Sequence, residues 1–212
     1  NGQLKEIETQ SILKSLNQKI NENVKKYSPE SVGCFISPQS TSEEMYLFQR
    51  LSRALGVNNI DHRTNEQDFA YQDSYPVMPS LGTNLSNLHE FDNIILIGTN
   101  IKTEFPILTV RFNDAVKKNT NIYSYHFINM PEDFDVKKNF VMNNSDLLSV
   151  FQDHSLESCR GKKNLVIIGP NITYFYNQSL FFQAIEAFAS NINATVGYLT
   201  DFCNSTSGWI LG

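Results

Sequence analysis

The sequence predicts an α/β fold with doubly wound, mostly parallel sheets. Residues 93–97 and 164–168 are each an asparagine followed by four aliphatic residues, and such runs are typical of parallel strands buried on both faces. Helical periodicity follows each run, over residues 103–118 and 178–190. Strands that alternate with helices of this length indicate βαβ crossovers on a parallel sheet.

The remaining elements follow from the same periodicities. We expect an amphipathic helix at residues 5–25, short strands at 31–37, 122–128 and 195–199, and a short helix at 146–151. The first helix is expected to bury one apolar face, made of Ile7, Ile12, Leu13, Leu16 and Ile20. Residues 65–85 are polar and contain proline and glycine, which predicts a long irregular segment.

The chain is interpreted as one excised domain, residues 1–212. Both aliphatic strands are followed by a glycine and a polar turn, which suggests two similar α/β lobes. Residues 130–138 break the alternation of strands and helices, so the lobes are expected to comprise residues 1–135 and 136–212.

A complete helix is expected after residue 40. Thr41 can cap it, and Glu44 stands where a capping box needs its acidic residue. Gly56 supplies a left-handed residue at the end, and residues 58–61 are expected to form a polar turn. The inner stripe is predicted to comprise Leu47, Phe48, Leu51, Ala54 and Leu55.

A second predicted helix, at residues 103–118, has Thr103 as its cap and Pro106 in its first turn. The preceding turn, Gly98-Thr99-Asn100, could meet a ligand, because glycine permits close approach and the start of a helix offers free N–H groups. A purely geometric role for this turn is the favoured alternative, since short glycine motifs are weak evidence.

Residues 41–63 and 98–106 resemble two motifs of the molybdopterin oxidoreductase family. The resemblance implies a fold like domains 1–3 of formate dehydrogenase. The ending Asn58-Asn59-Ile60-Asp61-His62-Arg63 resembles more narrowly the large iron–sulfur subunit, the G chain, of NADH–quinone oxidoreductase (respiratory complex I).

Three departures from the catalytic members of that family stand in the sequence. Counting on from Asp61, Gln67 occupies the place of their metal ligand, and a neutral amide is a poor ligand for a high-valent metal. Ile101 replaces the usual proline of the Gly98 turn, and residues 122–131 contain no Asp-Pro-Arg segment.

The resemblance therefore implies a structural piece of complex I that has lost molybdopterin chemistry. It would hold no cofactor, with iron–sulfur clusters in a more N-terminal part of the full subunit. It would join other peripheral-arm subunits on the cytoplasmic side of a bacterial inner membrane. The alternative is a fragment of an active, formate dehydrogenase-like molybdopterin oxidoreductase. No catalytic or metal residue is assigned, and the remnant of a cofactor site is expected at Thr41, Asp61, Gly98, Thr99 and Asn100.

Composition and spacing exclude several other classes of function. The net charge is −5 and no basic stripe is present, which argues against nucleic acid as a partner. No apolar run is long enough for direct membrane insertion. The three cysteines and four histidines lack metal-ligand spacing. The polar run Asp61-His62-Arg63 is interpreted as a hydrogen-bonded cluster in preference to a binding site.

Overall fold

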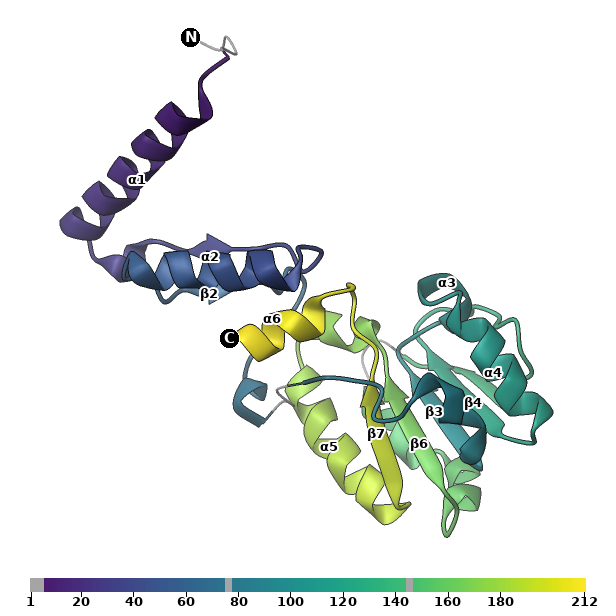
Figure 1. Ribbon diagram of the computed structural model, residues 1–212. Coiled ribbons are helices and arrows are strands. Elements are labelled where there is room, and N and C mark those ends of the chain that lie inside the picture. Colours follow the sequence, from purple (N-terminus) through teal and green to yellow (C-terminus); the bar gives the residue numbers. More distant parts are fainter. Residues whose placement is uncertain (1–5, 75–77, 144–146) are drawn as a thin grey trace. The chain divides into compact units, whose positions relative to one another are not determined.

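The computed structural model describes residues 6–74, 78–143 and 147–212 (Figure 1). The chain divides into two compact units. The first unit comprises residues Asn1–Arg63 and Phe202–Gly212, and the second comprises Thr64–Asp201. This division corrects the expected boundary at residue 135, because strands from both sides of that residue pair within one sheet of the second unit. The predicted helix starts at Lys5 and Asp146 lie outside the described residues.

The second unit contains a five-stranded sheet in the order β5-β4-β3-β6-β7, with every described pair parallel. This confirms the predicted fold class. The strands are β3 (Asn93–Ile97), β4 (Asn121–His126), β5 (Lys138–Val141), β6 (Asn164–Ile168) and β7 (Ala194–Tyr198). The two aliphatic runs lie side by side as β3 and β6, with Asn93 opposite Asn164. The edge strand β5 was not predicted, because its residues are polar or largely exposed and show no apolar run.

Helices cover both faces of this sheet (Figure 1). One face packs against α4 (Leu108–Lys117) and the short 3-10 helix η3 (Leu85–Glu90), with Ile94, Leu96 and Phe112 in the shared core. The opposite face packs against α5 (Gln178–Asn191), where Phe181 and Ile185 meet alternate residues of the same strands. The predicted helix at residues 178–190 is thus confirmed, and both faces of β3 and β6 are buried as their sequences indicate.

The helix predicted at residues 103–118 is broken into α3 (Ile101–Glu104) and α4. The N-terminal cap of α3 is Asn100, whose Oδ1 accepts a hydrogen bond from the backbone N–H of Thr103 at 3.0 Å. Thr103 is therefore inside the first helix and does not cap the second. The break has a local cause, because Pro106 disfavours a helical conformation at the preceding residue, and Phe105 has φ −134° and ψ 57°.

In the first unit the predicted capping box is present at the start of α2 (Ser42–Ala54). The backbone N–H of Thr41 donates to Glu44 Oε2 at 2.8 Å, and Glu44 N–H donates to Thr41 Oγ1 at 3.2 Å. The unit also contains α1 (Thr9–Lys26), β1 (Cys34–Phe35), β2 (Ile60–Asp61) and α6 (Ser205–Leu211). Residues 58–61 were predicted as a turn, but Ile60 and Asp61 pair in parallel with β1.

Two predicted helix faces differ from the observed ones. On α2 the buried residues are Met45, Gln49 and Ser52, whereas Leu47 is 65% exposed. The buried face contacts α6, and Gln49 Nε2 donates to the carbonyl oxygen of Leu211. Four of the residues predicted to form the inner face of the first helix are exposed: Ile7, Ile12, Leu13 and Leu16. Among the described helices, none is both long enough and apolar enough to cross a membrane.

Candidate functional site

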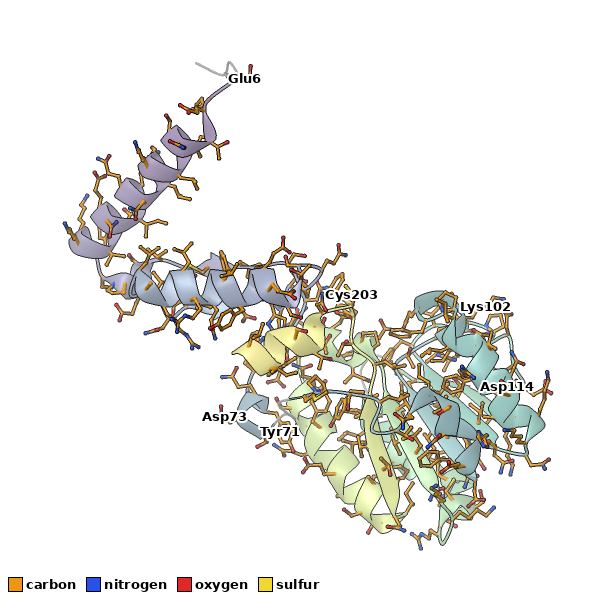
Figure 2. All side chains as sticks on the ribbon, viewed as in Figure 1. Glu6, Tyr71, Asp73, Lys102, Asp114 and Cys203 are labelled. Carbon is orange, nitrogen blue, oxygen red and sulfur yellow. The ribbon has the colours of Figure 1, made fainter. Side chains whose placement is uncertain are left out.

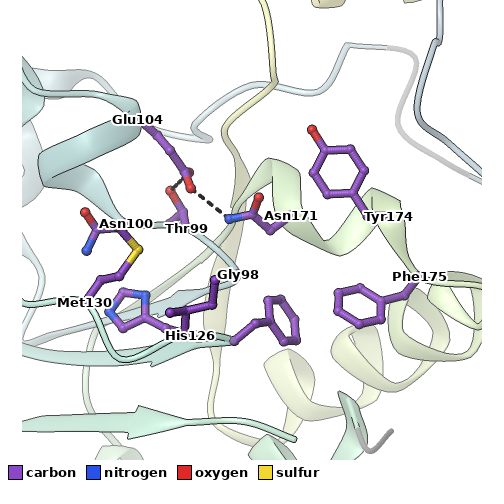
Figure 3. A pocket seen from close by; sticks show the side chains of 11 residues that line it. Gly98, Thr99, Asn100, Glu104, His126, Met130, Asn171, Tyr174 and Phe175 are labelled. Atoms are coloured by element: carbon purple, nitrogen blue, oxygen red, sulfur yellow. Dashed lines mark hydrogen bonds between the residues drawn. The ribbon is translucent and has the colours of Figure 1, made fainter. Parts of the chain in front are cut away.

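A cavity of about 230 Å³ lies beyond the carboxyl ends of β3, β4 and β6 (Figure 3). The strand order reverses at this place, because the chain runs from β3 to β4 and β5 on one side and returns to β6 and β7 on the other. Ligands of open parallel sheets bind at such switch points. The lining residues come from the turns after the three strands and from α3: Gly98, Thr99, Asn100, Glu104, His126, Phe127, Ile128, Met130, Asn171, Tyr174 and Phe175.

The carboxylate of Glu104 joins two of these turns (Figure 3). Its Oε2 accepts a hydrogen bond from Thr99 Oγ1 at 2.7 Å, and its Oε1 accepts one from Asn171 Nδ2 at 2.7 Å. Both donors are neutral. These two hydrogen bonds therefore position the Glu104 carboxylate but do not neutralise its negative charge.

Asn100 lines the cavity and has a side-chain donor without a partner among the described residues. Its Oδ1 accepts hydrogen bonds from the backbone N–H and the hydroxyl of Thr103, each at 3.0 Å. Because the backbone donor requires an oxygen there, the amide orientation follows from the hydrogen-bond network. The side chain is 3% exposed, and its Nδ2 has no hydrogen-bond partner among the described residues.

The start of α3, which was expected to offer free N–H groups, is occupied by the protein's own carboxylate. Glu132 Oε1 accepts from the N–H of Ile101, and Oε2 accepts from that of Lys102, both at 3.1 Å. The Glu132 side chain is fully buried. Burial raises its pKa, the two backbone hydrogen bonds oppose that rise, and the negative charge of Glu104 adds to it.

His126 lies beside this buried carboxylate. Its Nε2 is 2.7 Å from Ser124 Oγ and 3.7 Å from Glu132 Oε1. Burial lowers the pKa of His126, and a hydrogen bond to the backbone of Thr99 opposes that change. A neutral imidazole next to a buried carboxylate follows from this balance at neutral pH.

Gly98 allows the Ile172 side chain to pack closely against the turn after β3. Its φ of 68° is in the left-handed region, and an added Cβ would lie 2.8 Å from the side chain of Ile172. Glycine is therefore required by the backbone conformation and by a neighbouring side chain. The geometric role that the sequence favoured accounts for Gly98.

The other two predicted site residues lie in the first unit. Thr41 caps α2, as described above. Asp61 Oδ1 accepts from the N–H groups of His62 and Arg63 at 2.7 and 2.9 Å, and Asp61 Oδ2 accepts from Arg63 Nη2 at 2.9 Å. The Arg63 guanidinium lies 5.0 Å from the ring centroid of Trp209. Asp61 therefore organises the turn that follows β2.

Burial works to raise the pKa of Asp61, but the hydrogen bonds and charge of Arg63 outweigh it and leave the pKa below its usual value. Gln67 is exposed. Within the described part of the chain, no group of three His, Cys, Asp or Glu side chains is placed to hold a metal ion.

Comparison with known proteins decides the family. The sequence model of the family described as "Molybdopterin oxidoreductase" matches residues 1–204. The chain belongs to the molybdopterin oxidoreductase family. It is 30% identical over 126 residues to the F420-dependent formate dehydrogenase 1 subunit alpha of Methanococcus maripaludis, which covers 58% of this chain and 18% of that protein. A Staphylococcus aureus protein named as a formate dehydrogenase is 28% identical over 121 residues, covering 55% of this chain and 12% of that protein.

A solved structure shows the same fold over nearly the whole chain. It is the formyltransferase/hydrolase complex of Methylorubrum extorquens with methylofuran, with a TM-score of 0.60 and 10% identity. The match covers 94% of this chain and 59% of that chain. At this identity the likeness concerns the molybdopterin oxidoreductase-like α/β fold alone.

These relatives contradict the expectation of a complex I G chain. They are named formate dehydrogenases, and their names carry no reference to complex I or a quinone. The resemblance in residues 58–63 was therefore too short to assign the subunit. The formate dehydrogenase-like alternative fits the relatives better. The matched part of the chain spans less than a fifth of the length of either relative, 18% and 12%.

The family implies a molybdopterin cofactor, whose guanine dinucleotide form carries an anionic diphosphate. Among the described residues that line the cavity there is no Lys or Arg, and Glu104 faces the space. The N–H groups at the start of α3 are bound by Glu132. The volume of about 230 Å³ is below the range of roughly 300–1,000 Å³ typical of ligand pockets. The cavity does not fit that diphosphate.

Three residues that build this site were not found from the sequence. Asn171 follows β6 at a place that corresponds in register to the Gly98 turn, because Ile97 pairs with Ile168. Comparing the turns after the two aliphatic strands would have identified it. Glu104 lies within residues 98–106, which carry the family resemblance, but the periodicity places it in a continuous helix over residues 103–118. Glu132 lies in a segment with no periodic signal, and nothing in the sequence marks it.

Proposed function

We propose that this chain is a module of a formate dehydrogenase-like molybdopterin oxidoreductase. The observation that carries the proposal is the sequence similarity to the Methanococcus maripaludis formate dehydrogenase subunit, 30% over 126 residues. The family match over residues 1–204 supports the same class of protein. The reaction of the whole protein would be the two-electron oxidation of formate to carbon dioxide, with release of one proton.

The described residues favour a scaffolding and positioning role for this module within the enzyme. Glu104 and Glu132 fix the turns at the carboxyl edge of the sheet. The described residues include no group of three His, Cys, Asp or Glu side chains that is placed to hold a metal ion, and the cavity does not fit an anionic diphosphate. We therefore propose that the groups that hold the metal and the diphosphate come from polypeptide outside these 212 residues. The presence of iron–sulfur clusters in a more N-terminal part of the full subunit stays a prediction.

The test uses the complete native protein that contains this chain. Formate-dependent reduction of a viologen dye would be measured together with molybdenum content by elemental analysis. We expect stoichiometric molybdenum and dye reduction with formate, and no reduction with acetate. A folded protein that holds no molybdenum, or that holds it and leaves formate unoxidised, would show that the proposal is wrong.

A further inference from the structure

The cavity at the β3–β6 switch point is negatively charged. Glu104 lines it, and the residues that donate hydrogen bonds to its carboxylate, Thr99 and Asn171, are neutral. Lys102 on α3 is exposed and donates to Asp133 Oδ1 at 2.6 Å (Figure 2). A partly buried carboxylate gains most from a ligand that brings positive charge together with hydrogen-bond donors.

One wall of the cavity is aromatic. The rings of Phe127 and Phe175 have centroids 4.4 Å apart and are tilted by 39°, and Tyr174 lines the same space. A guanidinium group stacks on aromatic faces and keeps its N–H edges available for a carboxylate. An ammonium is a compact and more strongly hydrated charge, so it suits such a wall less well.

Asn100 indicates a second feature of the ligand. Asn100 lines this cavity. Its buried Nδ2 has no hydrogen-bond partner among the described residues, while its Oδ1 is fixed by Thr103. A buried donor without a partner is destabilising. A ligand that fills the cavity should therefore carry an acceptor, such as a carbonyl oxygen, for this amide.

We propose that the cavity binds a small guanidinium compound that also carries a carbonyl oxygen, of the kind represented by an arginine amide. The guanidinium pairs with Glu104 and lies against the aromatic wall, while the carbonyl oxygen accepts a hydrogen bond from Asn100. This inference goes beyond the proposed function and does not depend on it, because it rests only on the lining of the cavity.

Titration calorimetry of the 212-residue chain with L-argininamide tests the proposal. We expect saturable binding that weakens by about tenfold or more in Glu104→Gln, since a charge-assisted contact is lost. The matched control is Asp114→Asn, which removes the same charge from an exposed position on α4 (Figure 2) and should bind like the parent chain. Inorganic pyrophosphate should not bind.

A second variant separates the two contacts. Asn100→Ser keeps an oxygen that can cap α3 but removes the amide donor. It should weaken the binding of L-argininamide several-fold and leave the binding of agmatine, which lacks the carbonyl, unchanged. Comparing the two ligands on the parent chain and on Asn100→Ser tests the proposed binding site even if Glu104→Gln does not fold.

Three results would overturn the proposal: no binding of L-argininamide, equal binding by the parent chain and Glu104→Gln, or saturable binding of pyrophosphate. Each is distinguishable from a failure of the proposed function, because the titration involves neither formate nor a metal. A complete protein that does not oxidise formate would leave the proposed ligand site unaffected.

Discussion

Gly169 and Gly98 bring the turns after β6 and β3 into direct backbone contact. The N–H of Gly169 donates to the carbonyl oxygen of Ile97 at 2.8 Å, and the N–H of Asn171 donates to that of Gly98 at 3.2 Å. A Cβ added to Gly169 would lie 2.5 Å from the Gly98 carbonyl oxygen. This contact helps to shape the cavity, because Thr99 and Asn171, which lie on the two turns, both donate hydrogen bonds to Glu104.

Gly169→Ala is therefore expected to destabilise the chain. Its φ of −90° is accessible to alanine, so the cost comes from overpacking, about 1–3 kcal/mol in the free energy of unfolding. Denaturant unfolding measures the change. The control is Gly33→Ala, because no atom lies within 4 Å of the added Cβ there. Equal unfolding midpoints for the two variants would show that the turns can separate without cost.

The central elements of the fold could be predicted because their signals are local. The aliphatic runs of β3 and β6 and the capping box of Thr41 and Glu44 were placed correctly. The faces of α1 and α2 were not, because periodicity identifies an apolar stripe but not what covers it. On α2 the buried face packs against α6, which was not predicted, and the polar side chain of Gln49 donates a hydrogen bond to the carbonyl oxygen of Leu211 in α6.

The candidate site was predictable only in part, for the same physical reason. The sequence identified Gly98, Thr99 and Asn100 because they directly follow a recognisable strand. The charge of the cavity depends on Glu104, and the start of α3 depends on Glu132, whose contacts with Ile101 and Lys102 span about thirty residues of sequence. Family resemblance predicted the remnant of a cofactor site at this place, and the tertiary contacts put the carboxylate of Glu104 there.

A buried asparagine is expected to be important for the stability of the sheet. Asn164 Nδ2 lies within hydrogen-bonding distance of the carbonyl oxygens of Cys159 and Ile192, at 2.8 and 2.7 Å, and its Oδ1 accepts from Asn93 at 2.8 Å. Asn164→Ala removes the hydrogen bonds to the buried Ile192 carbonyl oxygen and Asn93 Nδ2, whereas the Cys159 carbonyl oxygen still accepts from the N–H of Lys162. We therefore expect a loss of about 3 kcal/mol. Asn121→Ala, at a less buried position of the same row, should cost about 1 kcal/mol. Thermal and denaturant unfolding would contradict this if both variants lost the same amount.

The last prediction concerns the pH dependence that Asp61 gives to the first unit. Burial works to raise the pKa of Asp61, but the side-chain hydrogen bonds and charge of Arg63 lower it below its ordinary value. A carboxyl group whose folded pKa is lowered contributes stability above its unfolded pKa of about 3.9, and this contribution is lost as the pH falls through the folded pKa.

Asp61→Asn isolates that contribution. Asparagine keeps an oxygen for the N–H groups of His62 and Arg63 but loses the charge that Arg63 Nη2 contacts at 2.9 Å. At pH 7 and low salt we expect the variant to be less stable by about 1 kcal/mol, because the pair is partly exposed and screened by solvent. The difference from the parent chain should shrink as the pH is lowered from about 5 to below 3, and it should also shrink with added salt.

Trp209 provides the measurement, because it is the single tryptophan of the chain and the Arg63 guanidinium lies over its ring. Unfolding followed by tryptophan fluorescence at several pH values would give the stability of both proteins. Asp114→Asn, at an exposed position on α4, controls for the loss of one negative charge. A stability difference for Asp61→Asn that stays constant from pH 7 to pH 3 would mean that the Asp61 charge does not stabilise the turn.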